Sequence, residues 1–505
     1  SGTPLIVISA DRPYELQSCG AAQTFDQVKL FGSLVRSFTD LGLPDESEAA
    51  LYGLRRSMAQ AVHAARFPLP GPVHVNARAR KPLEPCAPES ADELELADRV
   101  RRIAKSQPLA AEGPSVLPAP RVLDAVASAC RGTERGFIVC GPLPLNDANA
   151  SVDPAALLEL AKLTGFPILS ETASQVRFAS EPDPALCDGF DWLCRSASVL
   201  SQARPELILQ FGRPPTSSAY EQFLLTCPEA TRFVFAPYDW PDPSGQASAI
   251  VRGGTGAAVA SLCARFREQP RAPNRWSEFW ARANRIVWQA VDEELGRDAE
   301  LTEAVAVREV VGSLAIGSVL CLGNSLPIRE LDWFCQGEKR ALRVCTQRGL
   351  NGIDGLVSGA AGVASAADRE TTLLVGDVSF LHDVGGLYAA RELERPLTLV
   401  VLNNDGGRIF EQLPILRGSG PSAPDPRAWL TPHGLPLEHA SQLYGIQHTQ
   451  VSTLTELRAA LRRQATGTRV IEVRVSGRST TALLDAITER LQARLGNSGP
   501  DSPPR

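Results

Sequence analysis

The segment Gly376–Phe410 reads GDVSFLHDVGGLYAARELERPLTLVVLNNDGGRIF, and it decides the fold of this chain. An apolar run just before it, Thr371–Val375, has the length and β-branching of a buried strand. A helix-compatible segment follows at Val384–Leu393, and Pro396 separates it from a second apolar run, Leu397–Leu402. Strand, helix and strand of this size predict a βαβ unit with parallel neighbouring strands and a right-handed crossover.

Polar residues follow both predicted strands. Gly376 and Asp377 end the first, and the second ends at Asn403-Asn404-Asp405-Gly406-Gly407. Parallel strands place Asp377 and Asn404 at the same carboxyl edge, where open α/β sheets bind ligands. Each motif alone is ordinary turn chemistry. Together they predict a Mg²⁺ site with hard oxygen ligands, beside glycines that let the backbone approach a diphosphate closely.

Length and composition bound the possibilities. The 505 residues predict two to four domains, with 44% hydrophobic and 21% charged residues. A net charge of −6 gives no reason to expect nucleic acid or an anionic membrane as a partner. We see no apolar run long enough for a membrane span and no secretory leader, so we expect a cytoplasmic protein. The eleven scattered cysteines, without a CxxC pair, predict reduced and buried thiols.

The chain is expected to be α/β, with three doubly wound parallel-sheet domains, the first of them incomplete. In the first region, the sequence predicts a strand at Pro4–Ser9, a helix at about Ser47–Arg66 and a strand at Gly71–Asn76. It is shorter than an ordinary domain, so it resembles the back half of one. The chain begins at Ser1 and its only methionine is Met58, which suggests processing, trimming or an excerpt. We predict a partial domain at 1–85, a linker with one charged helix at 86–119, domains at 120–284 and 285–491, and a disordered tail at 492–505.

Further residues join the predicted edge of the third domain. Successive strand ends bring Ser325 and Arg329, and then Arg348, to the same rim as the Asp377 motif. A single rim arginine is usually structural, but two beside a metal–diphosphate site predict recognition of substrate carboxylates. Arg12, which follows the first strand, is either a loop salt bridge or an anion clamp.

Three apolar residues follow the glycine pair. Ile409, Phe410 and Leu413 could form a wall that lowers the dielectric around a charged intermediate. Their spacing is equally typical of ordinary core residues that open a helix. The sequence leaves these two alternatives open.

Several stretches resemble one family: SADRPYELQSCGAAQTF, GPVHVN, GNSLPIREL, QRGLNGIDGL, GDVSFLHD and NNDGGRIFEQLP. They resemble the MenD family of thiamine diphosphate (ThDP)-dependent synthases in menaquinone biosynthesis. Three of these motifs, GNSL…R, RG..GIDG and NN.GG.IF, are specific to this branch of the ThDP enzymes. The resemblance implies a pyrimidine-binding domain at 1–85, a middle, transhydrogenase-like domain at 120–284 and a diphosphate-binding domain at 285–491. It also implies a homodimer or homotetramer, in which two subunits build each site.

The resemblance implies roles for particular residues. Mg²⁺ (or Mn²⁺) would be held by Asp377, Asn404 and the carbonyl of Gly406, and Ile353 would be the apolar wedge that keeps the cofactor bent. The residues implied to contact the cofactor are Gly376, Asp377, Ser379, Asn404, Gly406, Ile353, Ile409, Phe410 and Leu413. Those implied to contact substrate are Arg12, Gln23, Ser325, Arg329 and Arg348.

The resemblance also implies a reaction. The family decarboxylates 2-oxoglutarate on ThDP and adds the resulting succinyl carbanion to the ring alkene of isochorismate. The thiazolium is the electron sink, and the protein supplies orientation and charge. Rim arginines fit this chemistry because both substrates are polycarboxylates.

Two departures from the family stand out. Ala22-Gln23 replaces the usual Asn-Gln, so one substrate contact is expected to be lost or replaced. The activating glutamate of the family lies before the strand Pro4–Ser9, and no residue here matches it; Glu15, Glu46 and Glu48 do not take its role. If residues 1–505 are the whole polypeptide, we expect weak ThDP binding and poor turnover. If they are an excerpt, we expect the complete enzyme to be active.

Two other functions stay open at this point. One is another ThDP-dependent 2-oxoacid decarboxylase, such as an acetolactate-synthase-like enzyme, although the two rim arginines argue against small neutral substrates. The other is a catalytically impaired homologue or regulatory partner, which the unmatched glutamate motivates. Turnover of 2-oxoglutarate rather than pyruvate would distinguish them from the synthase.

Overall fold

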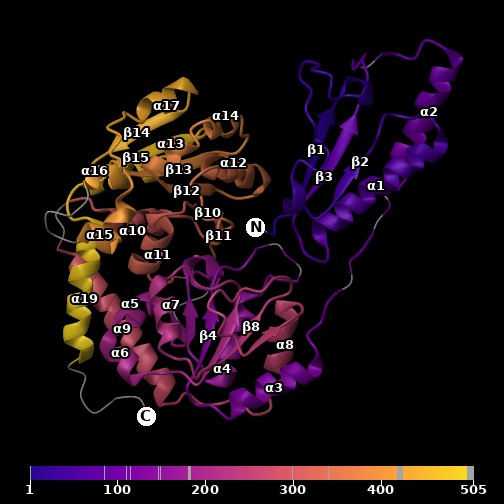
Figure 1. Cartoon of the computed structure of the whole chain (residues 1–505). Coiled ribbons are helices and arrows are strands. Elements are labelled where there is room, and N and C mark those ends of the chain that lie inside the picture. The colour runs from indigo at the N-terminus through magenta and orange to yellow at the C-terminus, as the bar shows by residue number, and fades with distance from the viewer. Residues whose placement is uncertain are drawn as a thin grey trace. The chain divides into compact units, whose positions relative to one another are not determined.

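A computed structural model describes the chain as two compact units, Ser1–Ser115 and Val116–Arg505. Each unit is considered by itself. Figure 1 shows the elements of both. The residues that the structure describes are 2–84, 86–107, 109, 111–113, 115–145, 147, 149–179, 183–297, 300–338, 340–417 and 425–496.

The first unit is a three-stranded parallel sheet with two helices. Its strand order is β1-β3-β2, with Leu5 opposite Pro72 in the first pair and Phe38 opposite His74 in the second. The Ser47 hydroxyl caps α1 by accepting from the Ala50 amide at 3.2 Å. The elements are β1 (Leu5–Asp11), η1 (Tyr14–Leu16), η2 (Gly32–Leu34), β2 (Phe38–Asp40), α1 (Glu48–Arg66), β3 (Pro72–Arg78) and α2 (Ala91–Lys105).

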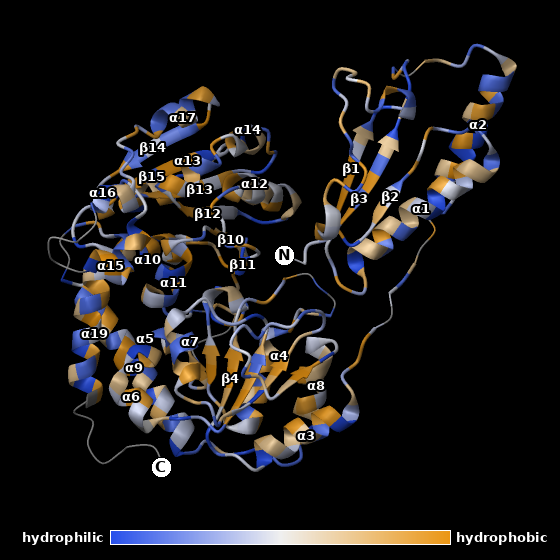
Figure 2. Cartoon of the chain, viewed as in Figure 1, coloured by the Kyte–Doolittle hydropathy of each residue, from blue (hydrophilic) through white to orange (hydrophobic). Residues whose placement is uncertain are grey.

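The second unit contains two six-stranded parallel sheets. The first has the order β6-β5-β4-β7-β8-β9, and its central strands are buried hydrophobic segments, coloured orange in Figure 2. Buried on both faces, they read as continuous apolar runs. Its elements are α3 (Pro120–Arg131), β4 (Gly136–Cys140), α4 (Pro154–Thr164), β5 (Ile168–Ser170), η3 (Thr172–Ser174), β6 (Leu186–Cys187), α5 (Phe190–Arg195), α6 (Ala197–Gln202), β7 (Leu207–Phe211), α7 (Ser218–Leu225), β8 (Thr231–Phe235), β9 (Ala249–Val251), α8 (Thr255–Phe266) and α9 (Arg275–Leu295).

The second sheet of this unit has the order β11-β10-β12-β13-β15-β14. From β10 the chain adds β11 on one side and then β12 on the other, so the topological switch point lies between β10 and β12. Ligands bind at such points in open α/β sheets. Its elements are α10 (Glu303–Ser313), β10 (Val319–Leu322), α11 (Leu326–Phe334), β11 (Arg343–Thr346), α12 (Leu356–Ala366), β12 (Thr371–Gly376), α13 (Asp377–His382), α14 (Gly386–Arg391), β13 (Leu397–Asn403), η4 (Arg408–Gln412), α15 (Pro414–Arg417), α16 (Pro426–Leu430), α17 (Glu438–Leu443), β14 (Gln447–Val451), α18 (Leu454–Arg462), β15 (Arg469–Arg474) and α19 (Thr480–Gly496).

All three sheets are parallel, so the predicted α/β class is confirmed, and so is the βαβ unit between β12 and β13. The prediction of one crossover helix at 384–393 is wrong in detail. The crossover is two short helices, α13 and α14, interrupted at residues 383–385. The helix begins at Asp377 itself, directly after the strand, and the Asp383 carboxylate accepts from the Ser358 amide and hydroxyl instead of continuing the helix.

Other expectations meet the structure with small differences. The predicted boundary at 284/285 falls inside α9, and α19 continues to Gly496, five residues into the predicted tail. The remaining tail residues, 497–505, lie outside the described residues. Eight cysteines are buried as expected and Cys345 is half-buried, but Cys19, in the loop after β1, and Cys86 are exposed. Within the described part of the chain, no helix has both the length and the apolar character of a membrane span.

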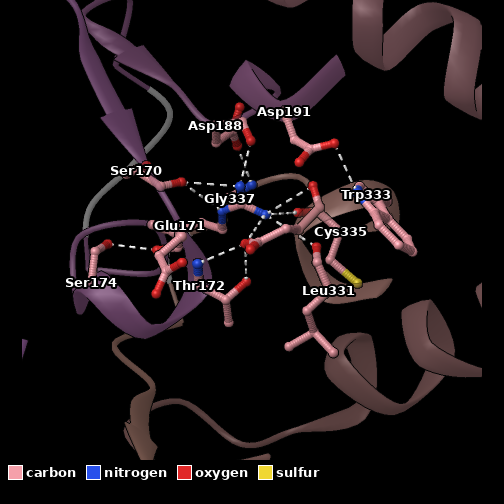
Figure 3. Close-up of polar contacts among 12 residues, drawn as sticks. Ser170, Glu171, Thr172, Ser174, Asp188, Asp191, Leu331, Trp333, Cys335 and Gly337 are labelled. Carbon is pink, nitrogen blue, oxygen red and sulfur yellow. Dashed lines mark hydrogen bonds and ion pairs between the residues drawn. The ribbon is translucent and has the colours of Figure 1, made fainter. Parts of the chain in front are cut away.

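A buried polar cluster joins the two sheets of the second unit. The fully buried Arg177 guanidinium donates to the carbonyl oxygens of Ser170 at 3.0 Å, Leu331 at 3.1 Å and Cys335 at 3.2 Å. It also pairs with Asp332 at 3.3 Å. Figure 3 shows these carbonyls converging from β5 and from α11 and the residue that follows it. The cluster therefore fixes α11, the helix that carries Arg329, against the first sheet.

Acidic groups surround this cluster. The Thr172 amide donates to Asp332 Oδ1 at 2.7 Å, and the neighbouring Glu171 carboxylate accepts from the Thr216 amide at 2.6 Å. The second oxygen of Glu171 is buried without a hydrogen-bond partner. Burial, with the charge of Asp332 second, raises the pKa of Glu171 from an ordinary 4.5 to about 8. Glu171 therefore holds its proton to a higher pH than an exposed glutamate does.

Replacing the central guanidinium should be costly. Arg177→Ala leaves the buried Asp332 carboxylate without its positively charged partner and removes a hydrogen-bond donor from several carbonyl oxygens, so we expect the free energy of unfolding to fall by about 3–5 kcal/mol. The control Arg213→Ala removes a half-exposed pair with Asp239 and should cost less than about 1 kcal/mol. Urea denaturation measures both, and equal losses would contradict the role given to Arg177.

The raised pKa of Glu171 predicts a pH-dependent stability. In the unfolded chain the carboxyl ionises near pH 4.5, whereas in the folded chain it ionises near pH 8. Its contribution is therefore complete below pH 4.5 and is lost progressively up to pH 8. Glu171→Gln should gain melting temperature relative to the parent chain between pH 5 and pH 8. A difference that does not change with pH would show that Glu171 ionises normally.

Candidate functional site

The edge formed by β12 and β13 brings an acid and a loop together. Gly376 lies opposite Leu402 in the parallel register, so both strands end at the same level. Asp377 accepts from the Val378 amide at 2.7 Å through Oδ1 and from the Gly406 amide at 3.0 Å through Oδ2. Asp377 is only 1% exposed, and its side chain faces the loop after β13. The structure thus joins the two motifs of the sequence by a direct hydrogen bond.

Asn404 presents one free oxygen to this edge. Its Nδ2 donates to Glu303 Oε1 at 2.7 Å, and its main-chain oxygen accepts from Arg408 Nε at 2.9 Å. Its Oδ1 is buried and has no hydrogen-bond partner. A buried acceptor of this kind costs free energy unless a ligand takes it up. The amide oxygen is therefore available to a cation.

Gly406 occupies a position that only glycine can fill. Its φ is 139°, and a Cβ there would overlap the main-chain oxygen of Leu430. The next amide, that of Gly407, donates to the same oxygen at 2.7 Å. The close packing against the end of α16 holds the loop backbone beside Asp377.

His433 also contacts this edge and was not foreseen from the sequence. The Leu435 amide donates to its Nδ1 at 3.0 Å, so the ring proton is on Nε2, 3.2 Å from Asp377 Oδ2. Burial raises the pKa of Asp377, while the amides of Gly406 and Val378 and the His433 ring oppose that shift. His433 lies in a loop well after the motif, so no local pattern could have indicated it.

The donor set fits a hard cation. Asp377 offers a carboxylate, Asn404 an orphaned amide oxygen, and Gly406 a backbone carbonyl. Within the described residues there is no group of three or more His, Cys, Asp or Glu placed to hold a metal. One carboxylate with amide, carbonyl and phosphate oxygens suits Mg²⁺, which is bound by few protein ligands together with phosphates.

The three predicted substrate residues of the third sheet lie close together. Ser325 has φ 73° and ψ −128°, a strained conformation for a serine, directly before α11. Arg329 Nη1 donates to the main-chain oxygen of Ser325 at 2.6 Å, and Arg348 Nη1 donates to Asn324 Oδ1 at 2.9 Å. Asn324, another residue that sequence reasoning did not single out, thus joins the ends of β10 and β11. Its position in a Gly-Asn pair after a strand was the available signal.

Both arginines are partly desolvated cations. Burial lowers the pKa of Arg329 and of Arg348, and for Arg348 the nearby positive charge of Arg329 acts in the same direction. Asp332 and Glu171 oppose the shift in both cases. Two guanidinium groups that repel one another in a poorly solvated place would gain from an incoming carboxylate.

The predicted cofactor-contacting apolar residues are placed at the surface of this edge. Ile353 is half-buried in the loop before α12, and Ile409 and Phe410 lie in η4, followed by Leu413. Phe410 remains 41% exposed and packs edge-on against Trp429. This exposure disfavours a pure core role for Phe410, whereas Ile409 does pack on the core. Ser379 is buried within α13, and Gly376 has open space where a side chain would be.

The remaining predicted substrate residues, Arg12 and Gln23, belong to the first unit. The Arg12 amide donates to Asp11 Oδ1 at 2.8 Å, and its Nε is buried without a hydrogen-bond partner. Gln23 is exposed in a left-handed conformation, with φ 58°. Their participation in the site of the second unit stays a prediction. Glu15 pairs with Arg80 at 2.6 Å.

The sequence is similar to that of known proteins. Residues 335–473 match the family described as thiamine pyrophosphate enzyme, C-terminal TPP binding domain. This match covers β11 to β15 and hence both Asp377 and Asn404. The region that the family describes as binding the cofactor is therefore the region in which the acid, the amide and the glycine loop converge.

Similar full-length relatives carry one name, 2-succinyl-5-enolpyruvyl-6-hydroxy-3-cyclohexene-1-carboxylate synthase. The relative from Sorangium cellulosum is 40% identical over 99% of this chain and 82% of its own length. Those from Myxococcus xanthus and Geobacillus kaustophilus are 37% and 36% identical, over 98% and 94% of this chain and 83% and 80% of their own lengths. With this identity over nearly the whole chain, the protein belongs to the MenD family of ThDP-dependent synthases.

Proposed function

We propose that this chain is a ThDP- and Mg²⁺-dependent synthase that decarboxylates 2-oxoglutarate and adds its four-carbon remainder to isochorismate. The products are 2-succinyl-5-enolpyruvyl-6-hydroxy-3-cyclohexene-1-carboxylate and CO₂, in menaquinone biosynthesis. The observation that carries the proposal is the convergence of Asp377, Gly406 and the unpartnered Asn404 oxygen at one sheet edge. Family membership supports the choice of reaction.

The chain's own residues would bind and orient the metal ion and the cofactor. Asp377, Asn404 and the Gly406 carbonyl would hold the metal ion and, through it, the diphosphate of the cofactor. Ile353, Ile409, Phe410 and Leu413 would give the reactive end of the cofactor an apolar surround that excludes water. When bound, ThDP supplies the electron sink that decarboxylation of a 2-oxoacid requires.

The rim residues would select the substrates. Arg329 and Arg348 are the charged groups suited to carboxylates, and Ser325 is held beside Arg329. Because 2-oxoglutarate and isochorismate each carry two carboxylates, a pair of guanidinium groups favours them over pyruvate. This pair is the feature that favours the synthase over an acetolactate-synthase-like enzyme.

The assembly is part of the proposal. A homodimer or homotetramer would allow Arg12 and Gln23 of one subunit to complete a site with the second unit of another. Exposed apolar residues on the first unit support such an assembly, among them Leu5 at 55% and Ile8 at 61%. Light scattering after size-exclusion chromatography would show the number of subunits. We also propose a cytoplasmic location, where both substrates and ThDP are available.

Removing the acid tests the metal site. Asp377→Ala should lower ThDP affinity in the presence of Mg²⁺ by about 100-fold or more, because the ion loses its one carboxylate ligand. Isothermal titration with ThDP at saturating Mg²⁺ measures this. The control Asp485→Ala removes an exposed acid that pairs with Arg417 and should bind as the parent does. Unchanged affinity in Asp377→Ala would refute the assignment.

The reaction itself is tested with both substrates. With ThDP, Mg²⁺, 2-oxoglutarate and isochorismate, we expect CO₂ release and an adduct that keeps the enolpyruvyl group. Arg348→Gln should lower kcat/KM by about 30-fold or more, since it removes a half-buried charge suited to pairing with a substrate carboxylate. Pyruvate turnover without 2-oxoglutarate turnover would favour an acetolactate-synthase-like enzyme. Cofactor binding with turnover of neither would favour a catalytically impaired homologue.

A further inference from the structure

We infer that Glu303 is a positioning residue for the metal site, because it holds the Asn404 carboxamide in the orientation that leaves Oδ1 free for the ion. The inference rests on the proposed metal site. Glu303 is the first residue of α10, far in sequence from the motifs of the sheet edge. It would touch neither the metal nor the substrate and would act only through Asn404.

The orientation of an asparagine side chain is decided by what each end can do. Nδ2 of Asn404 only donates and Oδ1 only accepts, and the Nδ2 end is the one that faces Glu303 Oε1, which accepts from it. That contact is 2.7 Å long. Rotating the carboxamide would place Oδ1 against Glu303 Oε1, two acceptors in contact. Glu303 therefore directs Oδ1 to the opposite side, where it is buried and unpartnered.

Glu303 also has a contact through its second carboxyl oxygen, Oε2. The Thr480 hydroxyl, in the first turn of α19, lies 3.3 Å from Glu303 Oε2 and 2.6 Å from Glu330 Oε1. Glu330 is fully buried in α11. The Thr480 hydroxyl thus lies between the two buried carboxyl groups and ties the position of Glu303 to that of Glu330.

The resulting chain runs from Glu330 through Thr480 and Glu303 to Asn404. It draws on α11, α19 and α10, three helices from separate parts of the sequence. A leucine at position 303 could fill the space but would leave the carboxamide free to rotate. The structure contains a comparable pair that serves as a control, because Glu472 accepts from Asn403 Nδ2 at 2.6 Å, one residue before Asn404.

Metal affinity, rather than turnover, tests this inference. Free Mn²⁺ is measured by electron paramagnetic resonance while Mn²⁺ is titrated into the full chain at saturating ThDP. Glu303→Leu should weaken Mn²⁺ binding by about tenfold or more, the usual effect of losing an orienting partner. Glu303→Gln should bind within about threefold of the parent, because its oxygen still accepts from Asn404. Glu472→Leu should also stay within about threefold, since it leaves Asn404 and Glu303 in place.

Each outcome decides between distinct possibilities. A parent chain that binds no Mn²⁺ with ThDP contradicts the proposed metal site itself. A parent that binds, with Glu303→Leu binding equally well, overturns the positioning role alone, and so does equal weakening by Glu472→Leu. Thr480→Val removes one link without changing side-chain shape, and it should weaken Mn²⁺ binding by about fivefold or more, beyond the range set by the two control variants. If Glu303→Leu does not fold, unchanged binding in Thr480→Val overturns the inference.

Discussion

The parallel pairing of β12 with β13 is the constraint on which the site depends. In-register pairing up to Gly376 and Leu402 ends both strands at one level, so that Asp377 and the loop 403–407 leave from the same edge. The hydrogen bond from the Gly406 amide to Asp377 joins the segments that follow the two strands. A shift of one residue in this register would turn each side chain to the other face and separate these groups. The buried apolar faces of both strands oppose such a shift.

Several acidic side chains are buried in the protein interior. Glu303, Glu330, Glu171 and Asp332 are buried, and burial raises the pKa of each. Hydrogen bonds from asparagine, threonine, arginine and main-chain amides stabilise them. Such networks hold polar groups in one arrangement because each alternative leaves a buried donor or acceptor unpaired. Rigidity of this kind suits an enzyme that must place a metal ion and two rim arginines correctly before substrate arrives.

Local pattern predicted much of the fold. The strands β12 and β13 were foreseen to within one residue at each end, since buried parallel strands are short apolar runs bounded by glycine and polar residues. The crossover helix was misjudged because Asp383 bonds to Ser358, on α12, which is a tertiary contact. The edge strand β14 was missed, since its polar sequence, QHTQV, carries no apolar run. The boundary inside α9 was missed because a continuous helix joins the regions beneath both sheets.

The sequence by itself determined the parallel α/β class, the Gly-Asp and Asn-Asn pair at one sheet edge, and the two arginines on the rim beside it. These follow from strand length, strand order and the rule that parallel strands end together. Only the tertiary structure decided which partners complete them: His433 on Asp377, Asn324 under Arg348, and Glu303 behind Asn404. Those contacts join residues 24 to 101 positions apart, and burial, not local pattern, makes each of them necessary.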